Sequence, residues 1–203
     1  MRTASQLLTP LAAALALSLL ASCGSGNHAP AFCNDDAQCR KGRVCRYETC
    51  WWPGDAAMAD LGLNALAGAL ADALNHRDLA RLATHRLDIT DMVEVLGYPS
   101  YGEALAVHDV YLLSLEGDLL DLYQEEPFTG CVATDLELGA FAPFTVEDAE
   151  GEDRGVIRYV GNRLFLTCTA NGREYSRETP VGSLLYDGLR WIVLSLSGAS
   201  MPM

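Results

Sequence analysis

Basic residues are scarce in this chain of 203 residues, which has 14 lysines and arginines against 27 aspartates and glutamates. A surface with the resulting formal net charge of −13 repels nucleic acid and anionic lipid headgroups, so neither is expected as a direct binding partner. Hydrophobic residues make up 50% of the sequence, which excludes a disordered chain. The length suits one folded domain with short additional segments.

Motifs of well-known catalytic sites are absent as well. The sequence contains no His-Glu-x-x-His, no Walker-type phosphate-binding loop and no Gly-x-Gly-x-x-Gly. Residues 97–102 are spaced one residue too long for a nucleophile elbow, and Ser100 is better interpreted as a helix cap. The sequence therefore predicts no catalytic residues, no metal and no cofactor.

The first 22 residues have the layout of a secretory signal. Arg2 supplies the only charge, and the apolar run 11–20 is too short to span about 30 Å of hydrocarbon. The segment leads into Leu20-Ala21-Ser22-Cys23, which resembles the lipobox of bacterial lipoproteins. That resemblance implies lipidation of Cys23, cleavage just before it and attachment to a membrane through several acyl chains. A plain secretory signal is the alternative.

The same resemblance predicts where the protein is located and how the chain is divided. It implies the bacterial cell envelope and, because Gly24 rather than Asp follows the lipidated cysteine, the outer membrane of a Gram-negative cell. Residues 23–32 then provide the lipidated cysteine and a flexible tether. Residues 33–52 form a Cys-rich module, and residues 53–203 form the main domain. The acidity belongs to the main domain, since residues 33–50 carry +1, whereas residues 53–203, with 9 basic and 24 acidic residues, carry −15.

Seven cysteines are many for a protein of this size, and Cys23 explains the odd number. The other six, in an oxidising compartment, predict up to three disulfides. Four of them follow the pattern Cys33-x5-Cys39-x5-Cys45-x4-Cys50, in a stretch too short to bury a core. Of their three connectivities we favour Cys33–Cys45 with Cys39–Cys50. A zinc site is the alternative, although no Cys-x2-Cys pair occurs.

The four-cysteine arrangement resembles short Cys-rich modules of bacterial, notably myxobacterial-type, surface lipoproteins. The resemblance covers little of the chain and implies no specific activity. Trp51 and Trp52 follow the module directly, and we expect them to pack on it. A binding platform and a membrane-interface anchor are the alternatives for these two side chains.

The main domain is predicted to begin with helices. Leucines recur at helical spacing in the Ala-rich segment 58–74, Asn75-His76 forms a break, and Asp78 can cap a shorter helix. A third helix is predicted over residues 101–116, between a capping pattern at Ser100 and Glu103 and a glycine at 117.

From about residue 128 the period of the pattern changes to that of strands. Apolar residues at 132, 136 and 138 and Thr134 alternate with the residues between them, as on a half-buried strand. Two-residue turns are predicted at Gly161-Asn162, Asn171-Gly172 and Asp187-Gly188, each between β-rich runs. Helices followed by a curled antiparallel meander indicate an α+β domain. Cys131 and Cys168 lie on predicted strands and can pair across the sheet; buried free thiols are the alternative.

This domain resembles the NTF2-like, or cystatin-like, superfamily. The resemblance rests on two segments, Leu66-x3-Leu70-x3-Leu74 continuing into Asn75-His76-Arg77-Asp78-Leu79-Ala80-x-Leu82, and the last hairpin 184–193 with its Asp187-Gly188-x-x-Trp191. It implies an early pair of helices and a curved sheet around a cone-shaped interior. Residues 88–127 depart from it, because they are longer and more helical than the superfamily's pattern.

Two further groups of residues are candidates for chemistry. His108 and Tyr111 share one face of the third predicted helix and are candidates to line a cavity, where His108 would be a base near neutral pH; a structural, hydrogen-bonded histidine is the alternative. The acidic cluster comprises Glu147, Asp148, Glu150, Glu152 and Asp153. It lacks the calcium-loop pattern and is interpreted as a solvated loop that offers the most plausible contact for a cationic partner.

The function predicted from these features is a lipid-anchored, non-enzymatic protein of the cell envelope. Its α+β domain would bind an unidentified protein or small molecule. Two other functions stay open. One is an enzyme of the isomerase or dehydratase type that uses an NTF2-like cavity. The other is a protease inhibitor that uses the Cys-rich module or a cystatin-like sheet.

Overall fold

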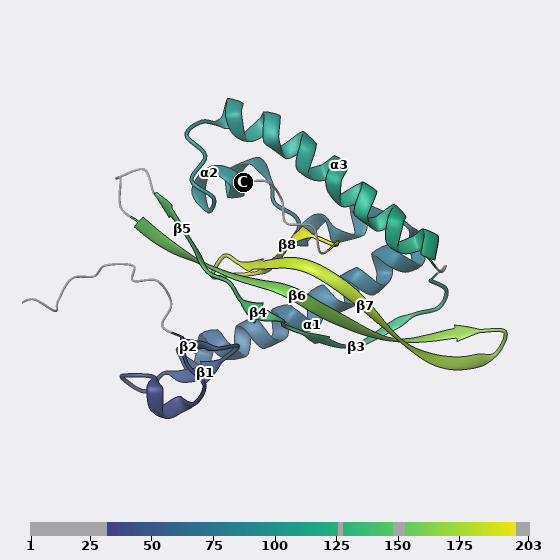
Figure 1. Ribbon diagram of the computed structural model, residues 1–203, viewed down its shortest axis with the longest axis horizontal. Coiled ribbons are helices and arrows are strands. Elements are labelled where there is room, and N and C mark those ends of the chain that lie inside the picture. The colour runs from purple at the N-terminus through teal and green to yellow at the C-terminus, as the bar shows by residue number, and fades with distance from the viewer. Residues whose placement is uncertain (1–31, 126–127, 148–152, 198–203) are drawn as a thin grey trace, which may run out of the picture.

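The computed structural model describes residues 32–125, 128–147 and 153–197. The predicted signal segment, Cys23 and the tether lie outside the described residues, as does most of the acidic cluster. The predicted mixture of helices and antiparallel sheet is confirmed, and so is a disulfide-rich region at the start of the described chain (Figure 1).

The helices come first in the main domain and the sheet follows (Figure 1). The helical elements are α1 (Pro53–His76), the 3-10 helix η2 (Leu79–His85), α2 (Ile89–Glu94) and α3 (Tyr101–Glu125). The strands of the sheet lie in the order β3 (Val132–Glu137), β6 (Asp153–Ala170), β7 (Arg173–Tyr186) and β8 (Trp191–Ser195). Two short strands, β4 (Ala140–Phe141) and β5 (Phe144–Glu147), also pair with β6, and all the pairings are antiparallel.

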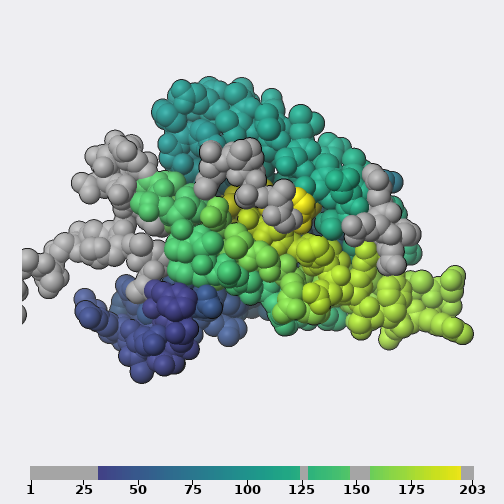
Figure 2. All heavy atoms as spheres, viewed as in Figure 1, coloured from purple at the N-terminus to yellow at the C-terminus, as the bar shows by residue number. Residues whose placement is uncertain are grey.

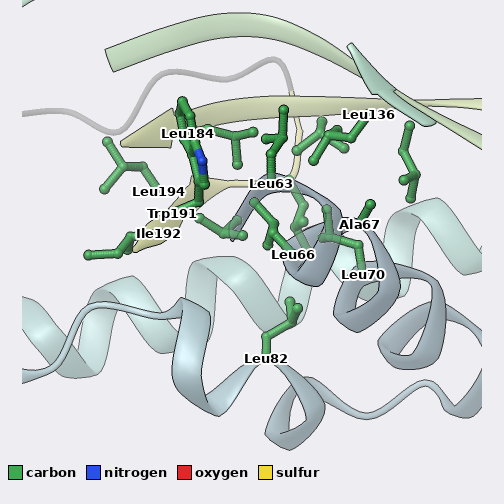
Figure 3. Close-up of a cluster of buried hydrophobic side chains, with 14 of the residues drawn as sticks. Leu63, Leu66, Ala67, Leu70, Leu82, Leu136, Leu184, Trp191, Ile192 and Leu194 are labelled. Atoms are coloured by element: carbon green, nitrogen blue, oxygen red, sulfur yellow. The ribbon is translucent and has the colours of Figure 1, made fainter. Parts of the chain in front are cut away.

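The core lies between α1 and the sheet, and Figure 3 shows its central side chains. Leu63, Leu66 and Leu70 of α1 are buried against Leu184 and Trp191 of the last hairpin. In addition, the Trp191 indole donates a hydrogen bond to the Ala59 carbonyl over 2.8 Å. Among the described helices α1 alone is long and apolar enough by composition to span a membrane, and four of its five leucines, at 63, 66, 70 and 74, are buried inside the protein.

The helix boundaries agree with the sequence at three of four points. The break lies at Arg77, whose backbone is left-handed at φ 55°, directly after the predicted Asn75-His76, which are the last two residues of α1. The Asp78 side chain caps η2 by accepting from the Ala80 N–H, as predicted. Ser100 accepts from the Glu103 N–H at the start of α3, as predicted. The predicted end at Gly117 is wrong, because α3 continues to Glu125. Buried Leu119 lies beyond the glycine, and its packing offsets a cost of about 1 kcal/mol for glycine inside a helix.

Of the three predicted two-residue turns, Asn171-Gly172 is confirmed between β6 and β7. Asp187-Gly188 does lie between β7 and β8, but the connection there has four residues, because Tyr186 pairs with Trp191. The predicted turn at Gly161-Asn162 is wrong, because both residues lie inside the 18-residue strand β6. Gly161 does adopt the left-handed conformation, at φ 69°, but it bends the strand without reversing it. Asn162 is buried there, and its amide donates to the Tyr159 and Gly182 carbonyls and accepts from the Gly139 N–H.

The predicted alternation along β3 holds only in part. A bulge between Ala133 and Asp135 inserts one extra residue, so the side chains before and after it change faces. Leu136 is buried as predicted, whereas Val132 and Thr134, which were expected on the same inner face, are exposed.

The Cys-rich module consists of the 3-10 helix η1 (Asp36–Gln38) and the hairpin of β1 (Val44–Arg46) and β2 (Thr49–Trp51). Its disulfides are Cys33–Cys45 and Cys39–Cys50, the favoured connectivity. A third disulfide, Cys131–Cys168, joins β6 to the residue before β3, as predicted. The sulfur atoms of Cys33, Cys39 and Cys50 lie within 4.8 Å of one another, but disulfide-bonded sulfur offers no thiolate to bind zinc.

The module and the main domain share one core. Trp51 is buried in the main core cluster, where its ring meets Tyr186 edge-on at 5.0 Å between centroids. Its indole donates to the Arg46 carbonyl, so Trp51 packs on the domain as well as on the module. Trp52, in contrast, is exposed, with the Arg43 guanidinium 5.2 Å above its ring.

Candidate functional site

A furrow runs along α1 between the module hairpin and strand β3. Its larger part is a hollow of about 480 Å³. Three parts of the chain line it: Arg46, Tyr47 and Glu48 of the module hairpin, Asp60, Leu63 and Asn64 of α1, and residues 135–139 with Tyr159 of the sheet region. In the space-filling view of Figure 2 the module forms a projection at one end of the molecule, against the start of α1.

The turn of the module hairpin positions the side chains of Arg46, Tyr47 and Glu48 in the furrow. Arg46 pairs with Thr49 across the hairpin, which leaves Tyr47 and Glu48 as a two-residue turn. Both are left-handed, at φ 52° and 59°, as a tight hairpin of this kind requires. Neither is the glycine or asparagine usual at such positions, so the two disulfides of the module and the contacts of Tyr47 with the domain must offset the strain.

Arg46, Tyr47 and Asp60 form a cluster, here called the Asp60 clamp, that joins the module to α1. The Arg46 guanidinium donates to both carboxylate oxygens of Asp60, over 3.0 and 3.1 Å, and the Tyr47 hydroxyl donates to the first of them. The guanidinium also lies 4.8 Å above the Tyr47 ring. This bidentate geometry fixes the direction of the hairpin as well as its distance from the helix.

Asp60 and Tyr47 are poorly suited to exchange a proton with each other or with a ligand near neutral pH. Burial raises the pKa of Asp60, but the hydrogen bonds from Arg46 and Tyr47 and the charge of Arg46 outweigh it, so the pKa lies below its usual range. Burial and the hydrogen bond to Asp60 raise the pKa of Tyr47 above its ordinary value. At neutral pH Asp60 is therefore a carboxylate and Tyr47 a phenol, and neither is poised to exchange a proton.

Tyr159 of β6 packs against Tyr47 and holds the turn of the module hairpin through its hydroxyl. Its hydroxyl donates to the Tyr47 carbonyl and lies 3.3 Å from the Thr49 hydroxyl. The ring is buried and contacts the rings of Tyr47 and Trp191, with centroids 6.3 and 5.7 Å away. The turn of the module hairpin is thus seated directly on the core of the domain.

A second hollow, of about 290 Å³, extends the furrow along α1 and shares Asn64 and Asp135 with the first. Small residues of α1, Ala67, Gly68 and Ala71, form one wall, and β3 forms the other. β3 is at the edge of the sheet, so one side of its backbone has no partner strand.

Two side chains occupy part of that free edge of β3. Asn75 of α1 both donates to the Cys131 carbonyl and accepts from the Cys131 N–H. Asp135 accepts from the N–H of Leu136. Together with the bulge, these contacts oppose the addition of another strand at the edge. The furrow is better suited to a ligand that uses side chains or charge than to one that pairs with the backbone.

The charge along the furrow is predominantly negative. The larger hollow is lined by four carboxylates, of Glu48, Asp60, Asp135 and Glu137, and one guanidinium, of Arg46. Asp60 is neutralised by Arg46, and Glu137 pairs with Arg163. Within the described parts of the chain, no ion pair joins Glu48 or Asp135 to a basic side chain. These two carboxylates give the furrow its negative charge.

His108 and Tyr111 are placed in packing contacts on the other side of the molecule. Tyr111 is buried, accepts from the Leu87 N–H and donates to the Val193 carbonyl over 2.6 Å. Burial raises its pKa. The His108 ring lies 3.2 Å from the Leu87 carbonyl. Neither residue lines the furrow, and both connect α3 to its neighbours.

The residues of the furrow escaped the sequence analysis because no motif marks them. Asp60 lies in an Ala-rich helix without a recognisable pattern around it. Tyr47 lies between Cys45 and Cys50, in a segment whose cysteine pattern predicts disulfides and says nothing of the tyrosine. Tyr159 is 112 positions from Tyr47 in the sequence, so no local pattern indicates that the two side chains meet. One signal was available: two residues, Tyr47 and Glu48, separate the short runs ending at Arg46 and starting at Thr49, as in a hairpin.

No protein-family model, curated protein or solved structure matches this chain.

Proposed function

We propose that this protein is an exported bacterial lipoprotein, anchored through Cys23, whose α+β domain binds a cationic partner or small ligand in the furrow. The observation that carries the binding proposal is the pair of carboxylates, Glu48 and Asp135, on facing walls of a hollow of about 480 Å³. The Asp60 clamp holds the module hairpin, which carries Glu48, against α1. A preformed site of that kind binds without the cost of ordering its own walls.

Support for the anchor comes from the sequence and from the disulfides. The four residues Leu20-Ala21-Ser22-Cys23 match the lipobox at every position. Disulfides persist in oxidising compartments outside the cytoplasm, and the three in this protein leave Cys23 as the odd cysteine. Export is the simplest explanation for both features.

The NTF2-like, or cystatin-like, superfamily remains our proposal for the fold of the main domain. It is supported by an early helix that ends near Asp78, by a curved antiparallel sheet, and by the last hairpin with Asp187-Gly188 and Trp191. The interior between α1 and the sheet is filled by Leu63, Leu66, Leu184 and Trp191, whereas the furrow lies at the surface. This packing favours a binding protein over an enzyme with a central cavity.

The binding proposal is tested with charged peptides of one length. We expect fluorescently labelled tetralysine to bind the full-length protein and tetraglutamate not to bind. The double variant E48Q/D135N should weaken tetralysine binding about fivefold or more, since each lost charge at a partly exposed site contributes up to about 1 kcal/mol. D121N/E174Q, at two exposed carboxylates outside the furrow, is the matched control for net charge. Equal weakening by D121N/E174Q would show that only the overall acidity acts.

The anchor is tested by mass spectrometry of the mature amino terminus. We expect a first residue of Cys23 that carries lipid, and a membrane fraction that contains the protein. C23A should abolish both. An unmodified amino terminus that begins before Cys23 would refute the anchor and leave the peptide-binding result unaffected.

A further inference from the structure

α3 carries a second apolar face that nothing in the described chain covers. Its inner face is buried through Ala104, Tyr111, Leu115 and Leu119. On the outer side Val110 is 65% exposed, Leu113 68% and Leu120 37%. In Figure 1 the helix runs along the upper side of the molecule, with the sheet on one side of it only. A surface helix normally has one apolar face, so the outer one calls for another explanation.

The outer residues follow the spacing of a helix–helix seam. Ala106, Val110, Leu113, Gly117 and Leu120 are separated by four, three, four and three positions. This is the heptad rhythm of positions a and d, which keeps apolar side chains facing a second helix for two turns or more. We refer to these five residues as the α3 seam.

Gly117 fits the seam better than it fits an isolated helix. It lies inside α3, where glycine costs about as much as any residue except proline, and a Cβ at this position would meet nothing within 4 Å. The chain itself therefore gains nothing from the missing side chain. A partner helix would gain, because a glycine in the seam allows a large side chain opposite it to approach the backbone.

The charges that α3 itself carries beside the seam are of one sign. Asp109 and Glu116 flank it on one side and Asp121 on the other, and α3 contains no lysine or arginine. Leu113, Glu116 and Leu120 also line a hollow of about 320 Å³ between α3 and η2, whose other charged residues are Arg77, Arg86 and Asp78. The carboxylates of α3 outnumber these two arginines around the seam, so they disfavour an anionic membrane and a second copy of α3 and attract lysine and arginine.

We propose that the α3 seam docks an amphipathic helix of another protein, with apolar residues at heptad spacing and lysine or arginine on both flanks. Apolar packing along Val110, Leu113 and Leu120 supplies the contact area, and the acidic flanks select the partner's charge. This surface is separate from the furrow and does not depend on it.

The test uses a designed peptide of 21 residues with leucine and alanine at a and d and lysine at e and g. Its controls are a shuffled peptide of the same composition and a peptide with glutamate at e and g. Affinity for the full-length protein is measured by fluorescence anisotropy at physiological salt. We expect L113K to weaken binding of the lysine peptide about tenfold or more. L61K, at a leucine of α1 that is 64% exposed, adds the same charge and should change the affinity less than about twofold.

Circular dichroism and thermal unfolding of both variants check that the protein is folded, which the exposure of Leu113 and Leu61 leads us to expect. Tighter binding of the patterned peptide than of the shuffled one, lost in L113K only, supports the proposal. Equal binding of the two lysine peptides, or equal effects of L113K and L61K, overturns it. A concentration-dependent dimer in sedimentation that L113K dissolves would assign the seam to a second copy instead. In E48Q/D135N, which weakens the furrow's own attraction for lysine, the preference for the patterned peptide over the shuffled one should persist.

Discussion

Asp60 receives three hydrogen bonds from two side chains of the module, although it is only partly buried. A carboxylate with a bidentate arginine partner is more strongly held than one in a single ion pair, because both oxygens are satisfied in one geometry. The tyrosine adds a donor that is neutral at every physiological pH. At the scale of single residues, this carboxylate contributes the polar contact between the module hairpin and α1, beside the aromatic contacts of Tyr47 and Trp51 with the domain.

Asp60→Asn should lower the free energy of unfolding by about 1 kcal/mol, a value that allows for the partial exposure of the clamp. The effect should depend on pH. Since the pKa of Asp60 is lowered by folding, its contribution is present above the unfolded pKa of roughly 4 and is lost as pH falls through the folded pKa. Chemical denaturation from neutral to acidic pH measures this.

The matched control is Asp109→Asn, at an exposed aspartate of α3 that lies 4.0 Å from His108. It should leave stability near neutral pH almost unchanged. If Asp60→Asn were as stable as the parent at pH 7, the clamp would contribute nothing to the docking of the module.

Elements of this fold were predictable wherever the signal was local. The leucine spacing of α1, the Ser100 cap and the Asn171-Gly172 turn are all determined by residues within a few positions of one another, and the structure agrees with them. The cysteine pairings agreed as well, since short spacings limit the choices within the module.

What failed depended on distant partners. Asn162 resembles a turn residue in sequence, but in the structure its amide joins β6 to Gly182 on β7 and to Gly139, which precedes β4. Gly117 resembles a helix end, but packing beyond it continues α3. The furrow could not be predicted, because Tyr47, Asp60 and Tyr159 meet only through tertiary contacts.

Glycines in two elements of this fold should respond in opposite ways to the same change. A Cβ on Gly182 of β7 would lie 1.9 Å from the Ser197 carbonyl oxygen, so Gly182→Ala must displace backbone and should cost about 3 kcal/mol or more. A Cβ on Gly68 of α1 meets nothing within 4 Å. Gly68→Ala should stabilise the protein by about 0.5–1 kcal/mol through helix propensity. Thermal unfolding of the two variants compares them directly, and a stable Gly182→Ala would contradict the close approach of β7 to the segment after β8.

At the scale of the whole molecule, the module and the main domain share one core, so the stability of each depends on the other. Trp51 contacts Tyr186, and Tyr47 contacts both Tyr159 and Trp191. A small Cys-rich unit on a linker would unfold independently of its neighbour. Here aromatic side chains of the module contact aromatic side chains of the main domain, which begins at residue 53, so the two parts should unfold together.

Replacing all four module cysteines by serine should therefore lower the thermal midpoint of the entire protein. Each disulfide contributes about 2–4 kcal/mol by restricting the unfolded chain. Near-ultraviolet circular dichroism and intrinsic tryptophan fluorescence should report a single transition at a lower temperature. The comparison variant, C131S/C168S, removes the disulfide of the sheet and leaves the Asp60 clamp in place. Two separate transitions in the four-serine protein would show that the module is independent.

One wall of the furrow is the module hairpin, whose turn carries Glu48 and belongs to the unit cross-linked by Cys33–Cys45 and Cys39–Cys50. We expect reduction of these four cysteines to loosen that wall, while α1 and β3 keep the opposite side of the hollow. Binding in the furrow, as we propose it, should therefore weaken in a reducing buffer and return on reoxidation, so the redox state of the surroundings would control the site.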